Sequence, residues 1–401
     1  MTYQVLARKW RPRNFDEVTG QAHVTTPLRG AIRTGRIPHA VLLTGPRGVG
    51  KTSLARILAR CLNCEKGPTE EPCGSCTACE EIANGASTDV QEIDAASRTS
   101  VDDVREIIES IRYAPSPGKH RIYVVDEVHM LSTPAFNALL KTLEEPPPRS
   151  LFVFATTNAE KIPYTVISRC QRYDLRRIPT AEVAARLGEV AAAEGLELSP
   201  ASLAALARAG EGSLRDALTL LDQVVAYAGT RVDEARVAEV LDLIDARLLA
   251  AIAEACVDGD PAAALRACRR AWEAGVDAKR LGAALLGTLR DLVVLRLAPD
   301  DPDLVEGSDA DLEALRALAG RTEQPRLRRM FRALLKEQED LAYAPEPFAV
   351  LEMAVVRLAS MPPGEEVQGL LARLDALERK LRGEAGKGPT RGETGGGGAG
   401  P

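Results

Sequence analysis

The chain has 401 residues, of which 45% are hydrophobic, and it carries a formal net charge of −6. This length suffices for two or three domains with cores of their own, and the acidic balance excludes a global basic field, so that any nucleic-acid surface must be local. No run approaches the roughly 18 apolar residues of a membrane helix, and the N-terminus lacks the apolar stretch of a secretory signal. We therefore expect a cytoplasmic protein without a membrane partner, in which cysteine thiols stay reduced.

Strand and helix patterns alternate over residues 40–175. Strands that alternate with helices imply a parallel α/β sheet with helices on both faces. Strand patterns occur at 40–44 (AVLLT), 89–94 (DVQEID), 121–127 (RIYVVDE) and 150–157 (SLFVFATT), and helical periods occur at 51–62, 101–112 and 134–145.

Strand patterns end near residue 179, and alanine, leucine, arginine and glutamate dominate as far as about residue 360. Ser/Pro starts and Gly stops indicate short helices here, and Ser213 is placed to cap one of them. We divide this half into a small helical domain at 179–242 and a larger one at 243–360, a boundary that rests on size. Residues 361–401 predict an amphipathic helix and a flexible glycine-rich tail, with apolar positions in the helix at Val367, Leu370, Leu374, Leu377 and Leu381.

The segment GPRGVGKT at 45–52 fits the pattern G-x-x-x-x-G-K-S/T. It follows a predicted strand and precedes a predicted helix, which is the context that this phosphate-binding loop requires. Its glycines allow backbone N–H groups to face nucleotide phosphates, while Lys51 would contact the β- and γ-phosphates and Thr52 would ligate Mg²⁺. The expected nucleotide contacts are Gly45, Pro46, Arg47, Gly48, Val49, Gly50, Lys51 and Thr52.

An acidic pair follows the apolar run at 121–125. This strand delivers Asp126 and Glu127 to its carboxyl end, where Asp126 could ligate Mg²⁺ and Glu127 could act as general base toward an attacking water. A solvated acidic pair at a strand end is the alternative. The order aspartate–glutamate after four apolar residues favours hydrolysis over simple binding.

Five of the eight cysteines lie within residues 61–79. Cys61 continues the apolar face of the predicted helix behind the loop, so we expect it in the core. The other four have the spacing C-x₈-C-x₂-C-x₂-C, and four thiolates suit a structural zinc site with no open position for catalysis. Free thiols are the alternative. The predicted zinc ligands are Cys64, Cys73, Cys76 and Cys79.

Several segments together resemble a known family. YQVLARKWRPRNFDEVTGQ, GPRGVGKT, DEVHMLSTPAFNALLKTLEEPP and ISRCQ resemble the clamp-loader branch of the AAA+ ATPases, and the cysteine insertion narrows the resemblance to the gamma/tau subunits of bacterial DNA polymerase III. The match is distinctive from about residue 3 to about 225 and looser to about 360. It implies an AAA+ nucleotide-binding domain at 1–178 with a zinc module at 61–82, a helical lid at 179–242 and a helical oligomerisation collar at 243–360. The chain resembles the family's short form or a truncated long form.

The resemblance also implies roles for single residues. Ala7 and Arg11 would lie near the adenine, and Thr157 would sense the γ-phosphate. Arg215 would point toward the nucleotide from the lid. Arg169 would be an arginine finger that reaches the ATP of a neighbouring subunit, where its charge would stabilise the transferring phosphoryl group.

The function that the resemblance implies is the ATPase motor of a sliding-clamp loader within the DNA polymerase III holoenzyme. ATP-bound subunits would open the ring-shaped clamp, and hydrolysis would release it on primed-template DNA, which supports processive replication. The implied cofactors are ATP, Mg²⁺ and Zn²⁺. The implied partners are delta, delta-prime and further gamma/tau copies in a hetero-oligomeric ring, together with the clamp and the DNA. Arg98, Lys141 and Lys161 could face the DNA, or could equally be solvated surface charges.

Two other functions fit the nucleotide motifs. One is a different AAA+ DNA motor, for branch migration or helicase activity, which the zinc module and the Ser-Arg-Cys motif disfavour. The other is a scaffold subunit that does not hydrolyse ATP. The presence of Lys51, Asp126, Glu127 and Arg169 disfavours the scaffold.

Overall fold

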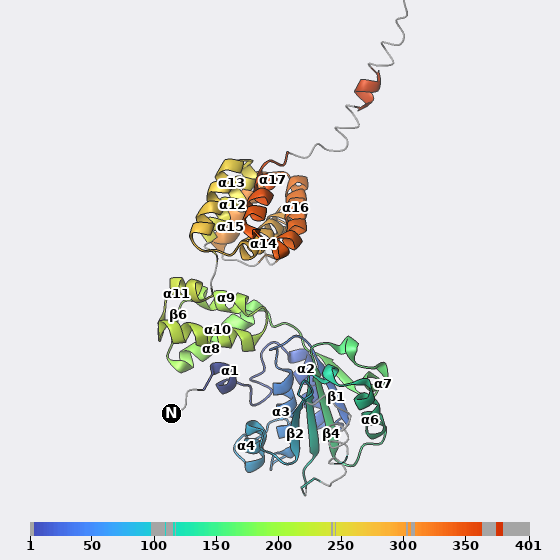
Figure 1. The fold of residues 1–401 in the computed structure, drawn as a ribbon. Helices are drawn as coiled ribbons and strands as arrows, with labels where there is room; N and C mark the ends of the chain where they lie inside the picture. The colour runs from blue at the N-terminus through green and yellow to red at the C-terminus, as the bar shows by residue number, and fades with distance from the viewer. Residues whose placement is uncertain are drawn as a thin grey trace, which may run out of the picture. The chain divides into compact units, whose positions relative to one another are not determined.

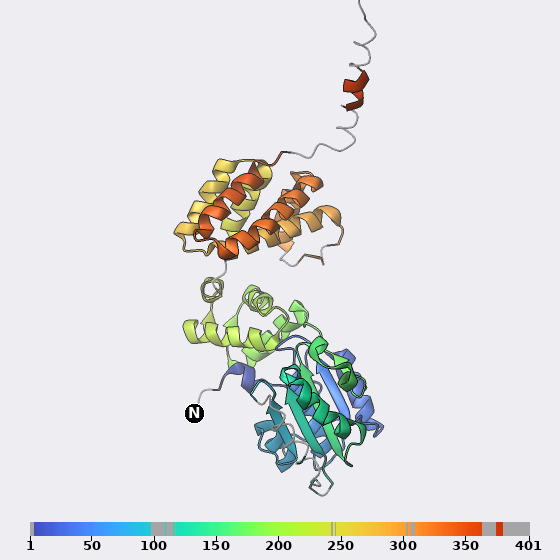
Figure 2. The same cartoon turned by 45° about the vertical axis from the view of Figure 1, so that its right-hand side comes forward.

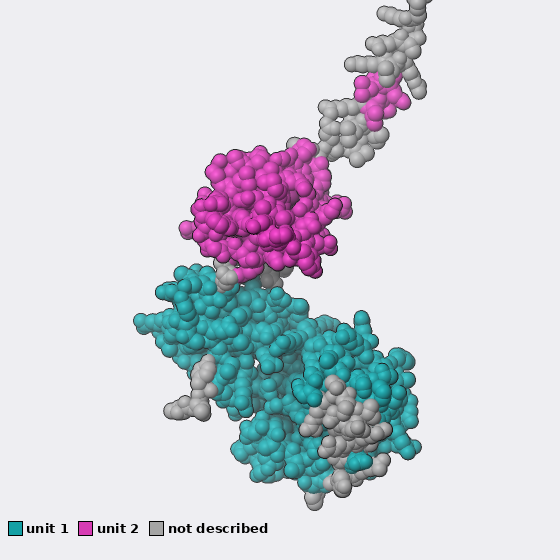
Figure 3. Space-filling model, viewed as in Figure 1, with its two compact units in different colours: residues 1–243 teal, residues 244–401 magenta. Residues whose placement is uncertain are grey.

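A computed structural model describes residues 4–97, 109, 115–116, 118–241, 244, 246–301, 304–305, 309–362 and 374–379. It divides into two compact units, residues 1–243 and 244–401 (Figure 3). The helix expected at 101–112, Arg98 and most of the C-terminal segment lie outside the described residues. Residues 374–379 are helical, with Leu374 and Leu377 exposed. No helix within the described residues is long and apolar enough to cross a membrane.

The first unit is built on a five-stranded sheet in which all neighbouring strands pair in parallel, in the order β2-β3-β4-β1-β5. This confirms the predicted parallel α/β sheet. β1 and β4 are buried along their whole length, because helices cover both faces, and this explains their continuous apolar sequence. The strands are β1 (Ala40–Thr44), β2 (Val90–Asp94), β3 (Arg121–Asp126), β4 (Ser150–Thr156) and β5 (Gln171–Asp174).

Each face of the sheet has its own core and its own helices (Figures 1 and 2). Alternate strand residues contribute to the two cores: Val41 and Leu43 pack toward α2 and α3, whereas Leu42 packs toward α6 and α7. The bounds are α2 (Ala22–Arg33), α3 (Lys51–Asn63), α6 (Thr133–Glu144) and α7 (Tyr164–Ile167), with α4 (Thr77–Asn84) beside α3 and short turns η1 (Val128–Met130) and η2 (Ala159–Lys161).

A helical part completes the first unit. Ser213 caps α10, since its Oγ accepts a hydrogen bond from the backbone N–H of Asp216 at 3.2 Å, as the sequence predicts. The N-terminal α1 packs here as well, and the N–H of Leu6 donates to the buried carboxylate of Asp222 at 2.6 Å. The elements are α1 (Leu6–Lys9), α8 (Thr180–Glu194), β6 (Glu197–Leu198), α9 (Pro200–Ala209), α10 (Leu214–Ala228), β7 (Arg231–Val232) and α11 (Glu234–Val240).

The second unit is helical in its described residues and has a separate core. Arg326 is buried in it, and its guanidinium donates to the carbonyls of Val257 (2.7 Å) and Cys256 (3.2 Å) at the end of α12. These bonds satisfy carbonyls that a helix end leaves without partners. The helices are α12 (Ala246–Asp258), α13 (Pro261–Glu273), α14 (Ala278–Leu297), α15 (Asp309–Gly320), α16 (Gln324–Tyr343) and α17 (Pro347–Ala359).

Candidate functional site

The loop GPRGVGK joins β1 to α3 at the carboxyl end of the sheet, and it touches the start of α10. Gly48 has φ +75°, and a Cβ there would lie 1.8 Å from the Oγ of Ser213. The position therefore requires glycine both for its backbone conformation and for the close approach of the capping serine. The carbonyl of Gly48 also accepts a hydrogen bond from the N–H of Arg215 at 3.4 Å. Loop and helical part are thus in direct contact.

Lys51 is buried at the start of α3, and its ammonium group turns back onto the loop. Nζ donates to the carbonyls of Gly45 at 2.9 Å and Pro46 at 2.8 Å. Burial lowers the pKa of this amine, while the negative charges of Glu127 and then Asp126 raise it. The cation is therefore held by two neutral acceptors, which phosphate oxygens can replace.

The two predicted Mg²⁺ ligands lie side by side. Thr52, in the first turn of α3, donates from Oγ1 to Oδ2 of Asp126 at the end of β3, at a distance of 2.7 Å. Mg²⁺ prefers six oxygen ligands in an octahedron. In proteins it commonly binds one or two side-chain oxygens, and phosphates and waters supply the others. The residues present therefore fit this ion.

Glu127 is held by a contact that the sequence did not predict. Its backbone has φ +46°, in the left-handed region. Oε2 accepts hydrogen bonds from the N–H (3.2 Å) and Oγ1 (3.0 Å) of Thr157, and Nδ1 of His129 lies 3.3 Å from the same oxygen. The expected base and the expected γ-phosphate sensor thus bind each other. No sequence signal links these residues, because they follow different strands.

A cavity of about 440 Å³ lies between the loop, the N-terminal segment and α10. Its size falls within the range of roughly 300–1,000 Å³ that is typical of small-molecule sites. Ala7, Arg11 and Arg215 line it, together with Asp126, Glu127 and loop residues Arg47–Thr52. Apolar lining residues that the sequence analysis missed are Trp10, Val18, Ile178, Leu214 and Leu218.

Arg169 is not among the residues that line this cavity. It follows α7, where its guanidinium donates to the carbonyl of Thr165 at 2.7 Å and pairs with Glu144 at 2.5 Å. The structure therefore does not bring Arg169 to the chain's own loop. Lys141 in α6 and Lys161 in η2 are exposed.

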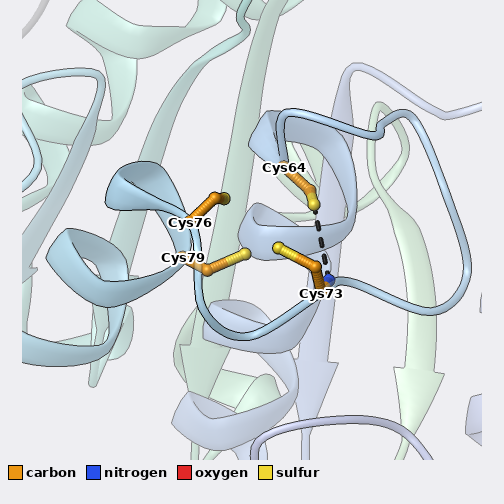
Figure 4. A group of neighbouring side chains, drawn as sticks. All are labelled: Cys64, Cys73, Cys76 and Cys79. Atoms are coloured by element: carbon orange, nitrogen blue, oxygen red, sulfur yellow. Dashed lines mark hydrogen bonds between the residues drawn. The ribbon is translucent and has the colours of Figure 1, made fainter.

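The four predicted zinc ligands come together beside α3 and α4 (Figure 4). The Sγ atoms of Cys64, Cys73, Cys76 and Cys79 all lie within 4.8 Å of one another. Zn–S bonds of about 2.3 Å in a tetrahedron require a spacing of this order, so the set fits a four-coordinate zinc ion. Cys61 is fully buried outside the group, as expected.

The thiols of this region differ in their tendency to ionise. Hydrogen bonds from the backbone N–H groups of Ser75 and Cys76 lower the pKa of the half-buried Cys73 thiol to about 6. Burial raises the pKa of Cys61 to about 12. Burial also raises the pKa of Cys79, so the cluster geometry, and not the ionisation of the free thiols, distinguishes the predicted ligands from the core residue Cys61.

Three family descriptions match the chain in succession. "DNA polymerase III, delta subunit" matches residues 20–179, "DNA polymerase III clamp loader subunit, ATPase lid domain" matches 182–230, and "DNA polymerase III subunits gamma and tau domain III" matches 232–370. Among solved structures, the chain is similar to the Thermotoga maritima RuvB Holliday junction branch migration motor, with a TM-score of 0.45, 21% identity, and coverage of 61% of this chain and 78% of that one.

Curated relatives extend over almost all of the chain. It is 38% identical to DNA polymerase III subunit tau of Bacillus subtilis, over 95% of this chain and 68% of that one. It is 41% identical to subunit tau of Escherichia coli, over 90% and 56%, and 36% identical to subunit gamma of Buchnera aphidicola, over 90% and 99%. The chain thus spans little more than half of the E. coli relative. With these identities and with the gamma and tau domain III after the lid, the chain belongs to the gamma/tau family of DNA polymerase III, whose members are AAA+ clamp-loader subunits.

Proposed function

We propose that this chain is an ATPase motor that loads a sliding clamp onto primed DNA in the bacterial cytoplasm. One observation carries the proposal: Lys51, Thr52, Asp126 and Glu127 meet at one cavity, with Thr52 Oγ1 2.7 Å from the Asp126 carboxylate. Cation, metal ligands and base in one place are what phosphoryl transfer to water requires.

In the proposed reaction, Lys51 exchanges its two carbonyl acceptors for the β- and γ-phosphates of ATP. Thr52 and Asp126 hold Mg²⁺, which when bound neutralises charge on the phosphates. Glu127 accepts the proton of the attacking water once Thr157 no longer holds its carboxylate, and Thr157 then becomes free to donate to the γ-phosphate. The bonds of Glu127 to Thr157, at 3.0 and 3.2 Å, support an inactive setting before ATP arrives.

The site is also placed so that nucleotide binding and hydrolysis can change the position of the helical lid. We propose an AAA+ domain at 1–178, a lid at 179–242 and a collar at 243–360 that assembles the ring. The division after residue 243 and the family match of the lid at 182–230 support this arrangement. Because the loop touches α10 through Gly48, occupancy of the loop would change the angle between domain and lid. Arg215 would follow the γ-phosphate from the lid side.

We infer that Arg169 acts on a neighbouring subunit. Its absence from the lining of the chain's own cavity and its pairing with Glu144 support this role. The neighbours would be delta, delta-prime and further gamma/tau copies. Lys141 and Lys161 would face primed DNA inside the ring, and Zn²⁺ at the four cysteines would stabilise the insertion.

The decisive experiment measures ATP turnover by the chain alone, then with primed DNA, and then with clamp and partner subunits. We expect low basal turnover and strong stimulation only in the complete mixture. Arg169→Ala should retain ATP binding and lose turnover only in the assembly, while the exposed control Arg33→Ala should behave as the unaltered chain. A complete mixture without stimulation would rule out the clamp-loading function.

A further inference from the structure

A second and larger cavity, of about 770 Å³, lies in the first unit between the N-terminal segment, α3, the cysteine region and α10. We call it the basic cleft. Its lining is strongly cationic although the chain has a net charge of −6, and Glu80 is the one acidic lining residue among those that the structure describes. The seven cationic residues of the lining are Arg8, Lys9, Arg11, Arg13, Arg56, Arg60 and Arg215.

Most of this positive charge is not neutralised by the protein. Lys9 pairs with Glu194 and Arg56 pairs with Glu92, each at 2.7 Å. Within the described part of the chain, no acceptor meets the guanidinium groups of the four remaining exposed or half-buried arginines. They are Arg8, Arg11, Arg13 and Arg215.

Arg60 adds a buried cation with an incomplete set of partners. Its side chain is only 6% exposed, and Nη1 donates to the carbonyl of Arg13 at 2.9 Å. Nε is buried and has no acceptor among the described atoms. A buried donor without an acceptor destabilises the folded state, so a native protein tolerates one mainly where a bound group supplies the missing acceptor.

Arg11 shows the electrostatic consequence of this crowding. Burial lowers the pKa of Arg11, the neighbouring charge of Arg56 lowers it further, and Arg215 and Arg8 add to the effect against the opposing charge of Glu92. Like charges are therefore gathered around a half-buried guanidinium. A bound anion would turn this repulsion into attraction.

We propose that the basic cleft binds a compact polyphosphate, such as inorganic pyrophosphate or the polyphosphate of a nucleotide, at a site distinct from the P-loop. Guanidinium forks pair with phosphate oxygens in bidentate geometry. Among the residues that the structure describes, the lining contains no aromatic side chain on which bases could stack, which disfavours a single nucleic-acid strand as the ligand.

The basic cleft shares a wall with the proposed ATP cavity, because Ala7, Arg11, Pro12 and Arg215 line both. A polyphosphate in the cleft would compete for the two shared guanidinium groups, so we expect it to weaken ATP binding. By reciprocity, ATP would weaken polyphosphate binding by the same factor. This coupling rests on the proposed function, whereas binding in the cleft does not.

The test is calorimetric titration of inorganic pyrophosphate into the full chain carrying Lys51→Ala, which disables the P-loop. We expect one binding site, with affinity reduced at least tenfold by the double change Arg8→Glu and Arg13→Glu. These two residues line only the basic cleft and are exposed, so the fold should persist, which circular dichroism checks. Arg33→Glu, an exposed charge reversal on α2, should leave the affinity unchanged.

Absence of pyrophosphate binding in the Lys51→Ala protein would overturn the proposal, as would an equal loss with Arg33→Glu. Tighter binding of an oligo-dT strand than of pyrophosphate, lost with the same double change, would replace it with a nucleic-acid site. Titration of ATP into the same Lys51→Ala protein, with and without the double change at Arg8 and Arg13, separates the sources. Binding tighter than that of pyrophosphate and weakened by the double change assigns the cleft to nucleotides, and weaker binding assigns it to free polyphosphate. Either order supports the site, even if the chain proved not to hydrolyse ATP.

Discussion

The ammonium group of Lys51 is buried, and it donates hydrogen bonds to the carbonyls of Gly45 and Pro46. Phosphate oxygens of ATP can replace these two neutral acceptors. Lys51→Ala should lower ATP affinity about 100-fold, since hydrogen bonds to charged groups contribute roughly 1.5–3 kcal/mol and the phosphates lose a buried cation. Titration with a fluorescent ATP analogue measures this. Lys336→Ala, an exposed change on α16, is the control, and an affinity within twofold of the unaltered chain would contradict the assignment.

The second prediction concerns Thr157, whose hydroxyl can donate a hydrogen bond either to Glu127 or to a phosphate. Thr157→Val removes this donor with little change in shape. We expect ATP affinity to stay within threefold and steady-state turnover in the complete assembly to fall about tenfold, because one neutral hydrogen bond contributes roughly 0.5–1.5 kcal/mol. Thr157→Ser restores the hydroxyl and should recover most of the turnover. Equal rates for the valine and serine variants would show that the hydroxyl has no part in hydrolysis.

At the residue scale, the sequence predicted groups whose spacing is local. Lys51 and Thr52 belong to one short motif, and Asp126 follows an unmistakable buried strand. Ile178 and Leu218 also line the cavity, but they are ordinary apolar residues brought there by the packing of distant segments. The bond between Glu127 and Thr157 was equally inaccessible, because it depends on which strands are neighbours and on the backbone conformation of Glu127.

The cysteine region joins the ends of α3 and α4 through one group of thiols. Cys76→Ser should remove most of the bound zinc, because a hydroxyl is a poor substitute for a thiolate. Metal analysis of the purified chain should give close to one zinc for the unaltered protein and for Cys61→Ala, whose side chain lies in the core. Thermal unfolding should show a lower midpoint for Cys76→Ser. Full zinc content in that variant would exclude Cys76 as a ligand.

At the element scale, strands β1, β3 and β4 were predicted almost to the residue, because they are buried on both faces and have continuous apolar runs. The two-residue pair β6 and β7 was not predicted. It joins Glu197 to Arg231 and Leu198 to Val232, and two residues contain too little sequence for any period to show. Short elements of this kind are determined by the long-range contacts around them.

The whole molecule contains two units, each with hydrophobic clusters of its own: two at the faces of the sheet and one in the helical part of the first unit, and a large helical cluster in the second. Each unit is long enough to form cores of ordinary domain size by itself. The boundary predicted at residue 242 rests on size alone and stays a prediction, whereas the structure divides into compact units after residue 243. What the sequence lacked was a linker signal, because helix-forming residues continue across the boundary.

The two units should unfold in two separate thermal transitions, and binding of ATP with Mg²⁺ should show which transition belongs to the first unit. A ligand at 100 times its Kd stabilises the native state that binds it by about 2.7 kcal/mol. For a unit of this size, that corresponds to a rise of roughly 5–10 °C in its midpoint. ATP with Mg²⁺ should therefore shift one calorimetric transition of the full chain and leave the other unchanged. A fragment of residues 244–362 should reproduce the unshifted transition, with or without ATP. The proposed ATP-binding residues and the cavity all lie before residue 243. If ATP shifted both transitions, the two units would unfold as one cooperative block, and the division into independent cores would be wrong.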